Sequence, residues 1–203
     1  MKIICVGRNY AAHAQELANA IPDQPLIFLK PETAVLEGNA PFVHPSFSKE
    51  IHWECELVYR VAQDGSHVSR EDAWQYIDGI GLGIDFTARD LQDEIKKKGH
   101  PWTLAKMFDH SAPISQFLDP KLFADHKNLQ FELRVNNAIR QSGFSGNMIF
   151  PLDVLIAYIS QFITLKKGDL IFTGTPEGVG KVNVGDRLQA SLEGKELLDF
   201  YVK

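Results

Sequence analysis

The stretch Ile51-His52-Trp53-Glu54-Cys55-Glu56-Leu57-Val58-Tyr59 decides how the rest of this 203-residue chain is interpreted. It is rich in aromatic and β-branched residues, which is typical of a β-strand. Residues two apart on a strand point to the same face, so we expect Glu54 and Glu56 to project together. Two adjacent carboxylates raise each other's pKa unless a cation lies between them or one of them stays protonated. The pattern therefore directs attention to a cation site.

A third carboxylate, Asp85, follows the apolar segment 79–84, which indicates a buried strand with a polar residue at its exit. A few carboxylates, with the other positions left to water or substrate, suit Mg²⁺ or Mn²⁺ better than zinc. On its own, Glu-x-Glu on a strand is more often the solvent-facing side of a half-buried sheet. Whether these three residues are interpreted as a metal site therefore depends on the motifs around them.

Length, charge and cysteine content limit the number of domains, the binding partners and the cellular compartment that can be expected. The length suits one domain with a sizeable core, and we expect a single catalytic domain over residues 1–203. The net charge of -5 argues against a nucleic-acid-binding surface. The basic run Lys96-Lys97-Lys98 is interpreted as the solvated end of a helix. Two cysteines, Cys5 and Cys55, are expected to be buried thiols. No segment resembles a signal peptide or a membrane span, so we predict a cytoplasmic protein without membrane contacts.

Glycine spacing excludes two nucleotide-binding classes. Ile84 occupies the position where a dinucleotide fingerprint that begins at Gly79 requires its last glycine. Gly180-Lys181 is followed by Val182 and lacks a glycine five residues before Gly180, so the phosphate-binding P-loop pattern fails too.

Short strands and a few helices alternate along the chain, which predicts a strand-rich α+β domain. The expected helices are residues 10–20, 70–77, 88–98 and 151–161. The expected strands are residues 2–6, 25–29, 51–59, 79–84, 129–135, 170–173, 187–192 and 196–202. Residues 32–48 and 141–150 are expected to form loops.

Several further motifs complete a recognisable set in order and spacing. They are Gly7-Arg8-Asn9-Tyr10-Ala11-Ala12-His13, Phe28-Leu29-Lys30-Pro31, Phe86-Thr87-Ala88-Arg89-Asp90-Leu91-Gln92, Trp102-Thr103-Leu104-Ala105-Lys106 and Thr173-Gly174-Thr175-Pro176. From Gly7 to the C-terminus the chain resembles the fumarylacetoacetate hydrolase family, in its branch of acylpyruvases, oxaloacetate decarboxylases or tautomerases, and dienoate isomerases. The resemblance implies the mixed β-roll of the family's C-terminal domain and a homodimer.

The resemblance also implies that Glu54, Glu56 and Asp85 bind Mg²⁺ or Mn²⁺. A 2-oxo acid can chelate such an ion through a carboxylate oxygen and its 2-keto oxygen. Hydrolysis of an acylpyruvate, decarboxylation of oxaloacetate and a double-bond shift all pass through an enolate of the 2-oxo acid. One site can therefore serve all three reactions, and they differ in which group moves the protons.

His13 and Glu16 are the candidate proton carriers. Their spacing places them on one face of the helix expected at residues 10–20, where the carboxylate can orient the imidazole. The resemblance implies that this helix is a mobile lid and that the pair acts on water or an enol. The alternative is a surface contact worth about a few tenths of a kcal/mol to the helix.

The remaining candidates are basic and polar residues. Lys106 is expected to neutralise substrate charge or a developing oxyanion, unless it is a surface lysine. Arg89 has an alternative structural role beside Asp85 or Asp90, and the turn at Thr175 has an alternative as an ordinary tight turn. The residues expected to contact substrate are Arg8, Lys30, Arg89, Gln92 and Thr175.

The sequence thus predicts a magnesium- or manganese-dependent enzyme that acts on small 2-oxo acids, as an acylpyruvate hydrolase or an oxaloacetate decarboxylase/tautomerase. An isomerase of the 2-hydroxyhepta-2,4-diene-1,7-dioate type is the alternative within the family. A non-catalytic metal- or metabolite-binding module is the alternative from another class, and the His13/Glu16 pair argues against it because binding needs no proton carrier.

Overall fold

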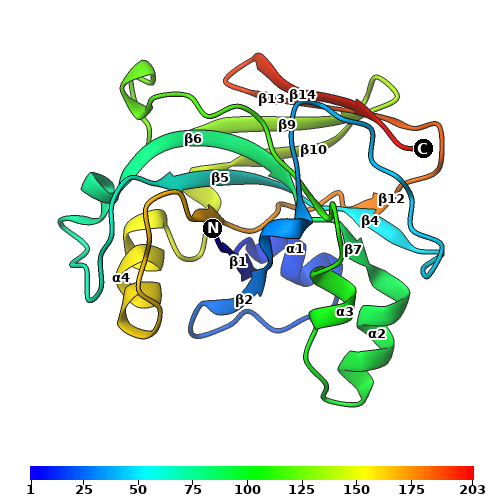
Figure 1. Cartoon of the computed structure of the whole chain (residues 1–203), viewed down its shortest axis with the longest axis horizontal. Helices are drawn as coiled ribbons and strands as arrows, with labels where there is room; N and C mark the ends of the chain where they lie inside the picture. The colour runs from blue at the N-terminus through cyan, green and yellow to red at the C-terminus, as the bar shows by residue number, and fades with distance from the viewer.

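Four β-sheets and four α-helices make up the computed structural model, which describes residues 1–203 (Figure 1). The strands are β1 Ile3–Gly7, β2 Leu26–Lys30, β3 Val35–Leu36, β4 Ile51–Trp53, β5 Cys55–Val61, β6 Ile77–Ile84, β7 Thr87–Ala88, β8 Ala112–Pro113, β9 Gln130–Val135, β10 Ala138–Phe144, β11 Leu170–Phe172, β12 Gly180–Lys181, β13 Arg187–Leu192 and β14 Lys195–Tyr201. The α-helices are α1 Ala11–Glu16, α2 Arg89–Lys97, α3 Thr103–Lys106 and α4 Leu152–Phe162. Short 3₁₀ turns lie at Glu32–Ala34, Ala73–Tyr76, Pro120–Leu122 and Ser145–Asn147.

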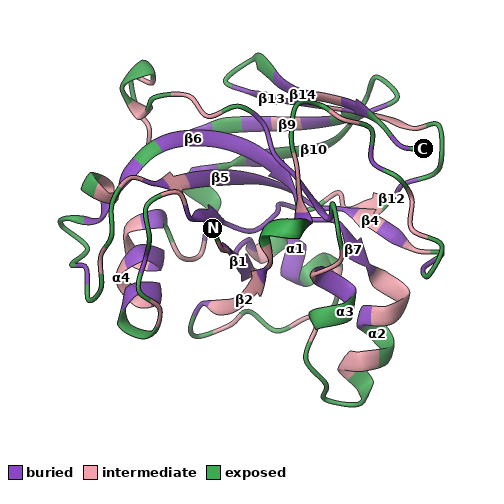
Figure 2. Ribbon diagram, viewed as in Figure 1, coloured by how far each residue is buried: buried purple, intermediate pink, exposed green.

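The five-stranded sheet, in the order β2-β1-β11-β5-β6, carries the centre of the molecule. Only β1 and β11 run parallel in it, so the sheet is mixed. Strands β5 and β6 of this sheet are buried along almost their whole length, as their colouring shows in Figure 2. Leu57 and Tyr59 of β5 pack in the large core, whereas Val58 packs in a smaller cluster with Cys5 and Phe172. A strand buried on both faces loses its alternation of apolar and polar residues.

A second sheet, in the order β10-β9-β13-β14, lies along the first one (Figure 1). Leu133 of β9 and Leu188 of β13 share the large core with Leu57 and Leu82 of the first sheet. Helix α4 adds Leu155 and other residues of its apolar stripe to the same core. No helix is both long and apolar enough to cross a membrane.

The stretch expected as one strand at residues 51–59 is two strands. Strand β4 pairs with β7 and β12 in a three-stranded sheet, whereas β5 pairs with β6 and β11 in the large sheet. Glu54 lies at the break between them, where the chain passes from one sheet to the other. The fold therefore places the first carboxylate of the Glu-x-Glu pair at a junction of two sheets.

Most expected elements are present, and three were wrong in extent or type. The helix expected at 10–20 ends at Glu16, and the helix expected at 70–77 is a 3₁₀ turn at Ala73–Tyr76. The loop expected at 141–150 begins as strand β10, which joins β9 through a turn where Asn136 and Asn137 have φ of 52° and 67°. Strand β10 buries Gln141 and Gly143 while its apolar residues face solvent, so hydrophobic periodicity could not reveal it.

Candidate active site

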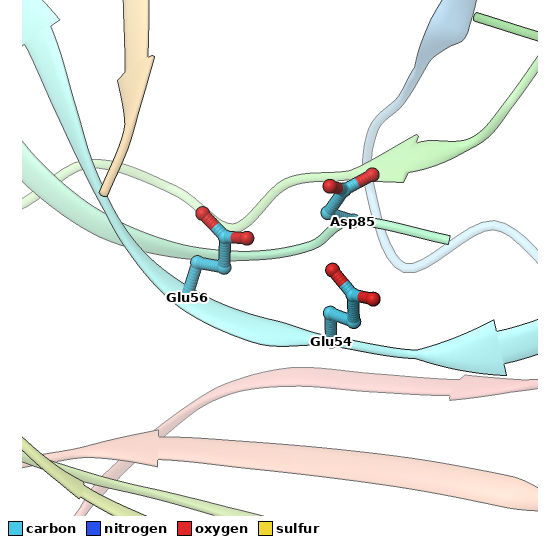
Figure 3. Close-up of side chains that lie close together, drawn as sticks. All are labelled: Glu54, Glu56 and Asp85. Carbon is cyan, nitrogen blue, oxygen red and sulfur yellow. The ribbon is translucent and has the colours of Figure 1, made fainter. Parts of the chain in front are cut away.

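Three buried carboxylates converge where β5 and β6 leave the large sheet. Glu54, Glu56 and Asp85 are 6%, 2% and 1% exposed, and their ligand oxygens lie within 4.8 Å of one another (Figure 3). Cys55 pairs with Ile84 across the two strands, and the amide of Asp85 donates to the carbonyl of Glu54 at 2.8 Å. Strand pairing therefore brings Asp85 beside the Glu-x-Glu pair although about thirty positions separate them in sequence.

The carboxylates fit a hard divalent cation. Oxygens that ligate Mg²⁺ at about 2.1 Å in an octahedron lie about 3 to 4 Å apart, which is within the spread of these three groups. Asp85 Oδ1 is buried and accepts no hydrogen bond, although Lys30 Nζ lies 2.8 Å away as an ion pair. Three carboxylates as the whole protein ligand set favour magnesium or manganese over zinc. The site can thus hold a divalent cation.

Basic side chains surround the acidic cluster. Lys106 Nζ lies between two carboxylates, 2.8 Å from Glu54 Oε2 and 2.6 Å from Asp85 Oδ2. Arg89 Nη2 donates to Glu54 Oε1 at 2.5 Å. Lys30 pairs with Asp85 and donates to main-chain carbonyls around it, including that of Phe86. Lys106 is 3% exposed, so its alternative as a surface lysine is wrong. These contacts leave Glu56 without a basic partner.

The two glutamates consequently differ in proton affinity. Burial alone would raise the pKa of Glu54, but Lys106 and Arg89 outweigh it and hold that pKa well below its ordinary value. Burial raises the pKa of Glu56 well above its ordinary value, and repulsion from Asp85 and Glu54 adds to the effect. Burial would lower the pKa of Lys106, yet attraction to Asp85 and Glu54 raises it, so Lys106 stays charged. Without a metal, Glu56 is the carboxyl that keeps its proton.

Helix α1 brings His13 to the same pocket, with Glu16 beside it on the helix. His13 is 5% exposed, and its Nδ1 lies 3.3 Å from Glu16 Oε2. The other oxygen of Glu16 accepts from the amide of Gly178 at 3.0 Å, which ties the helix to the turn after β11. His13 is therefore a buried, oriented imidazole whose Nε2 is left for another partner. The burial of His13 does not fit the surface-contact alternative, although Glu16 itself is exposed.

Arg89 and Gln92 face the pocket from helix α2. Arg89 Nη1 donates to Gln92 Oε1 at 2.7 Å, and the buried Gln92 has no protein acceptor for its amide N–H groups. The structural role considered for Arg89 is partly present, but its carboxylate partner is Glu54 rather than Asp85 or Asp90. Asp90 instead accepts from Ser48.

The turn after β11 supports the metal-binding candidates more than a substrate. The amide of Gly174 donates to Glu56 Oε2 at 2.7 Å, and Gly174 has φ of +91°, where a side chain would be strained. The Thr175 hydroxyl donates to the carbonyl of Cys55 and accepts from Gln141 Nε2, both at 2.8 Å. Its proton is thus not available to donate to a substrate carboxylate. Thr175 still lines the pocket, and its contact with substrate stays a prediction.

Two buried amides that received no role from the sequence fix the walls of the site. Gln141 accepts from the amide of Cys55 at 2.9 Å and donates to Thr175. Asn9 donates to the carbonyls of Thr173 and Phe150 and accepts from the amide of Phe150. Because both side chains are fully hydrogen-bonded, they fix the chain before α1 and the turn after β11 in position. The sequence does not show that these two side chains are buried, so it gave no reason to assign them a role.

The pocket itself is a small cavity of about 30 Å³. All three carboxylates line it together with polar and basic residues from four parts of the chain. The predicted site residues on its wall are Arg8, His13, Glu54, Glu56, Asp85, Arg89, Gln92, Lys106 and Thr175. Lys30 lies behind the wall, paired with Asp85. Leu17, Phe28, Lys96 and Trp102 also line the pocket and were not predicted.

This fold and this site define an enzyme in which carboxylates at the ends of sheet strands share one pocket with a histidine on a helix. Residues 2–201 match the family model described as fumarylacetoacetate (FAA) hydrolase C-terminal. The bovine oxaloacetate tautomerase FAHD1, mitochondrial, is 44% identical over 201 residues, which cover 99% of this chain and 91% of the bovine protein. The chain belongs to the fumarylacetoacetate hydrolase family.

Two solved structures support the assignment. The fumarylpyruvate hydrolase from Pseudomonas aeruginosa, in complex with Mn²⁺ and pyruvate, has a TM-score of 0.94 and 35% identity, with 100% of this chain and 89% of that chain covered. The 5-carboxymethyl-2-hydroxymuconate delta-isomerase from Mycobacterium smegmatis has a TM-score of 0.85 and 35% identity, with 99% and 78% covered. The strand-rich α+β fold with few short helices is thus confirmed, as is membership of an enzyme family.

Proposed function

We propose that this protein is a Mg²⁺- or Mn²⁺-dependent enzyme that converts small 2-oxo acids through their enolates. The observation that carries the proposal is the convergence of Glu54, Glu56 and Asp85 beside the buried His13. Oxaloacetate tautomerisation or decarboxylation and acylpyruvate hydrolysis are the reactions we propose. The bovine tautomerase and the bacterial fumarylpyruvate hydrolase support this choice.

When bound to the three carboxylates, the divalent ion would hold the carboxylate and 2-keto oxygens of the substrate and withdraw electron density from the keto group. The complex of the Pseudomonas aeruginosa enzyme with Mn²⁺ and pyruvate supports a site that takes both a divalent ion and a 2-oxo acid. Lys106 lies beside Glu54 and Asp85, so its ammonium group stabilises negative charge that develops on the substrate. The free amide N–H groups of Gln92 are placed to bind the substrate carboxylate.

The His13/Glu16 pair would move the proton. Glu16 occupies Nδ1 of the imidazole, so Nε2 is the atom that takes a proton from C3 of oxaloacetate or returns it there. In acylpyruvate hydrolysis the same nitrogen would accept a proton from the attacking water. The hydrogen bond from the Gly178 amide to Glu16 holds the pair in the closed position of the helix. We propose that helix α1 opens at this contact to admit substrate.

An isomerase of hydroxymuconate-type dienes is the second candidate, supported by the Mycobacterium smegmatis structure. It needs the same enolate and the same proton carrier. The non-catalytic binding module remains the less supported alternative, because a buried histidine oriented by a glutamate serves proton transfer rather than ligand affinity.

A substrate screen with added metal separates these activities. Purified protein with Mg²⁺ or Mn²⁺ would receive oxaloacetate, acetylpyruvate, fumarylpyruvate and a hydroxymuconate-type diene. We expect metal-dependent turnover of a 2-oxo acid and its loss in His13→Ala. The matched control is His100→Ala, because His100 is exposed and does not line the pocket. Metal-dependent turnover of none of the four compounds would leave only the binding module.

Three further properties stay proposals. The divalent ion is proposed to be Mg²⁺ or Mn²⁺, because both take carboxylate and water oxygens as ligands. A homodimer is expected from the family and can be tested by light scattering. The cytoplasm is our expected compartment, although the bovine relative is described as mitochondrial.

A further inference from the structure

Two basic side chains on the pocket wall have no carboxylate partner. Arg8 and Lys96 form no ion pair, whereas Lys106 and Arg89 are each paired with Glu54. Both unpaired residues are half-buried rather than free in solvent. Unpaired cations held partly away from water are unfavourable unless a ligand neutralises them. Their position therefore needs an explanation.

Lys96 does not belong to the solvated helix end that the sequence suggested. Arg89, Gln92 and Lys96 are spaced i, i+3 and i+7 on helix α2, so they form one stripe that faces the pocket. Lys97 is exposed and off that stripe, and Lys98 pairs with Glu94 at 2.6 Å. Only the first lysine of the run thus reaches the site.

The surroundings of Lys96 hold it in place. Its Nζ lies 5.5 Å from the centroid of the Trp102 ring, which also lines the pocket. Burial lowers the pKa of Lys96, and repulsion from Arg89 and Arg8 lowers it further. Attraction to Asp93 and Glu54 offsets part of this effect, but no carboxylate forms an ion pair with Lys96.

Arg8 is held at the same place by its backbone. Its φ is +57°, a left-handed conformation that non-glycine residues rarely adopt and that costs about 1 kcal/mol or more. The next residue, Asn9, is buried and bonded to Thr173 and Phe150, and the preceding Gly7 pairs with Leu26 in the sheet, so the chain on either side of Arg8 cannot relax easily. Such strain is typical of residues positioned for function.

The charge balance indicates what the two residues bind. Glu54 and Asp85 are already matched by Arg89, Lys106 and Lys30, and a bound divalent ion would add positive charge beside them. If a 2-oxo acid has only one carboxylate, that group binds at the metal, and the charges of Arg8 and Lys96 are not neutralised. A second carboxylate at the far end of the substrate would neutralise them.

We infer that Arg8 and Lys96 bind the second carboxylate of a dicarboxylic 2-oxo acid, and so make the enzyme select oxaloacetate-type substrates over monocarboxylic ones such as acetylpyruvate. The inference rests on the proposed function and assigns to this site its substrate class. Lys96 is a specificity residue in it, and Arg89, which is engaged with Glu54, is not.

The test compares Lys96→Met with Lys97→Met. For each protein kcat/KM is measured with oxaloacetate and with acetylpyruvate, and their ratio is taken. A second arm uses calorimetry in Mn²⁺ with N-oxalylglycine and oxamate, which share the chelating group and differ by a distal carboxylate. We expect Lys96→Met to lower both the substrate ratio and the relative affinity for N-oxalylglycine about tenfold or more, as for loss of a charge-assisted hydrogen bond.

Controls separate this inference from the proposed function. Lys97→Met should match the wild type in both arms, and Lys96→Arg should restore most of the preference because it keeps the charge. Equal ratios in Lys96→Met and Lys97→Met, in protein that still binds oxamate with Mn²⁺, would overturn the inference and leave the proposed function standing. Wild-type protein that binds neither probe and converts neither substrate would overturn both.

Discussion

The amide of Asp85 donates to the carbonyl of Glu54 across 2.8 Å, at the point where β5 and β6 leave the large sheet. This one main-chain hydrogen bond places two carboxylates from distant parts of the sequence beside each other. Glu56 joins them because it lies two residues further along the chain and its oxygen accepts from the amide of Gly174. The acidic cluster is thus built by strand pairing and needs no flexible loop to assemble.

Neutralising a proposed ligand should weaken metal binding without unfolding the protein. We expect Glu56→Gln and Asp85→Asn each to lower Mn²⁺ affinity by tenfold or more, because each removes a charged ligand. Calorimetric titration measures this, with Asp78→Asn as the control because Asp78 is exposed and pairs only with Arg60. Wild-type affinity in both ligand variants would remove these residues from the metal site.

The raised pKa of Glu56 makes the metal-free protein sensitive to pH. Its folded pKa lies above the ordinary value of 4.5, so above that pH the folded state holds a proton that the unfolded state has lost. The free energy of unfolding should therefore fall as pH rises above the ordinary value of 4.5 toward the raised pKa of folded Glu56, and added Mn²⁺ should reverse the loss. Melting temperatures of wild type and Glu56→Gln across this range give the measurement. Parallel curves for the two metal-free proteins would contradict the assignment.

Lys106 should matter most when no metal is present. Lys106→Met leaves Glu54 and Asp85 buried with less compensating charge, and breaking a buried pair costs about 3 to 5 kcal/mol. We expect a loss of that order in denaturant unfolding without metal, and a smaller loss in saturating Mn²⁺. Lys98→Met, which breaks only an exposed pair, is the control. An equal loss with and without metal would mean that the ammonium and the ion do not share the same carboxylates.

His13 should separate catalysis from binding. Proton transfer by a positioned side chain is worth about a hundred- to ten-thousand-fold in rate, so His13→Ala should lower kcat for acylpyruvate hydrolysis by that order. Oxalate affinity in Mn²⁺ should change little, since the three carboxylates remain. Decarboxylation should suffer less than hydrolysis because it needs no activated water. A parallel collapse of oxalate binding would make His13 a binding residue.

Elements with apolar strand or helix patterns could be predicted from the sequence, and so could the acidic cluster. Strand β10 could not, because its buried positions are Gln141 and Gly143, and the ring of Phe131 fills the space that a side chain at Gly143 would need. The position of Lys96 on the pocket wall was missed for a different reason. Three consecutive lysines look alike in sequence, and the rotation of helix α2 against the pocket decides which one points inward.

Oxalate binding with and without metal tests the central claim most directly, because oxalate resembles the planar enolate of a 2-oxo acid. Calorimetry would titrate oxalate into wild-type protein in Mn²⁺ and again in excess chelator, with Glu56→Gln beside it. We predict binding in Mn²⁺, none in chelator, and weakened binding in Glu56→Gln. Equal oxalate affinity in Mn²⁺ and in chelator would contradict the claim that Glu54, Glu56 and Asp85 act through a bound cation.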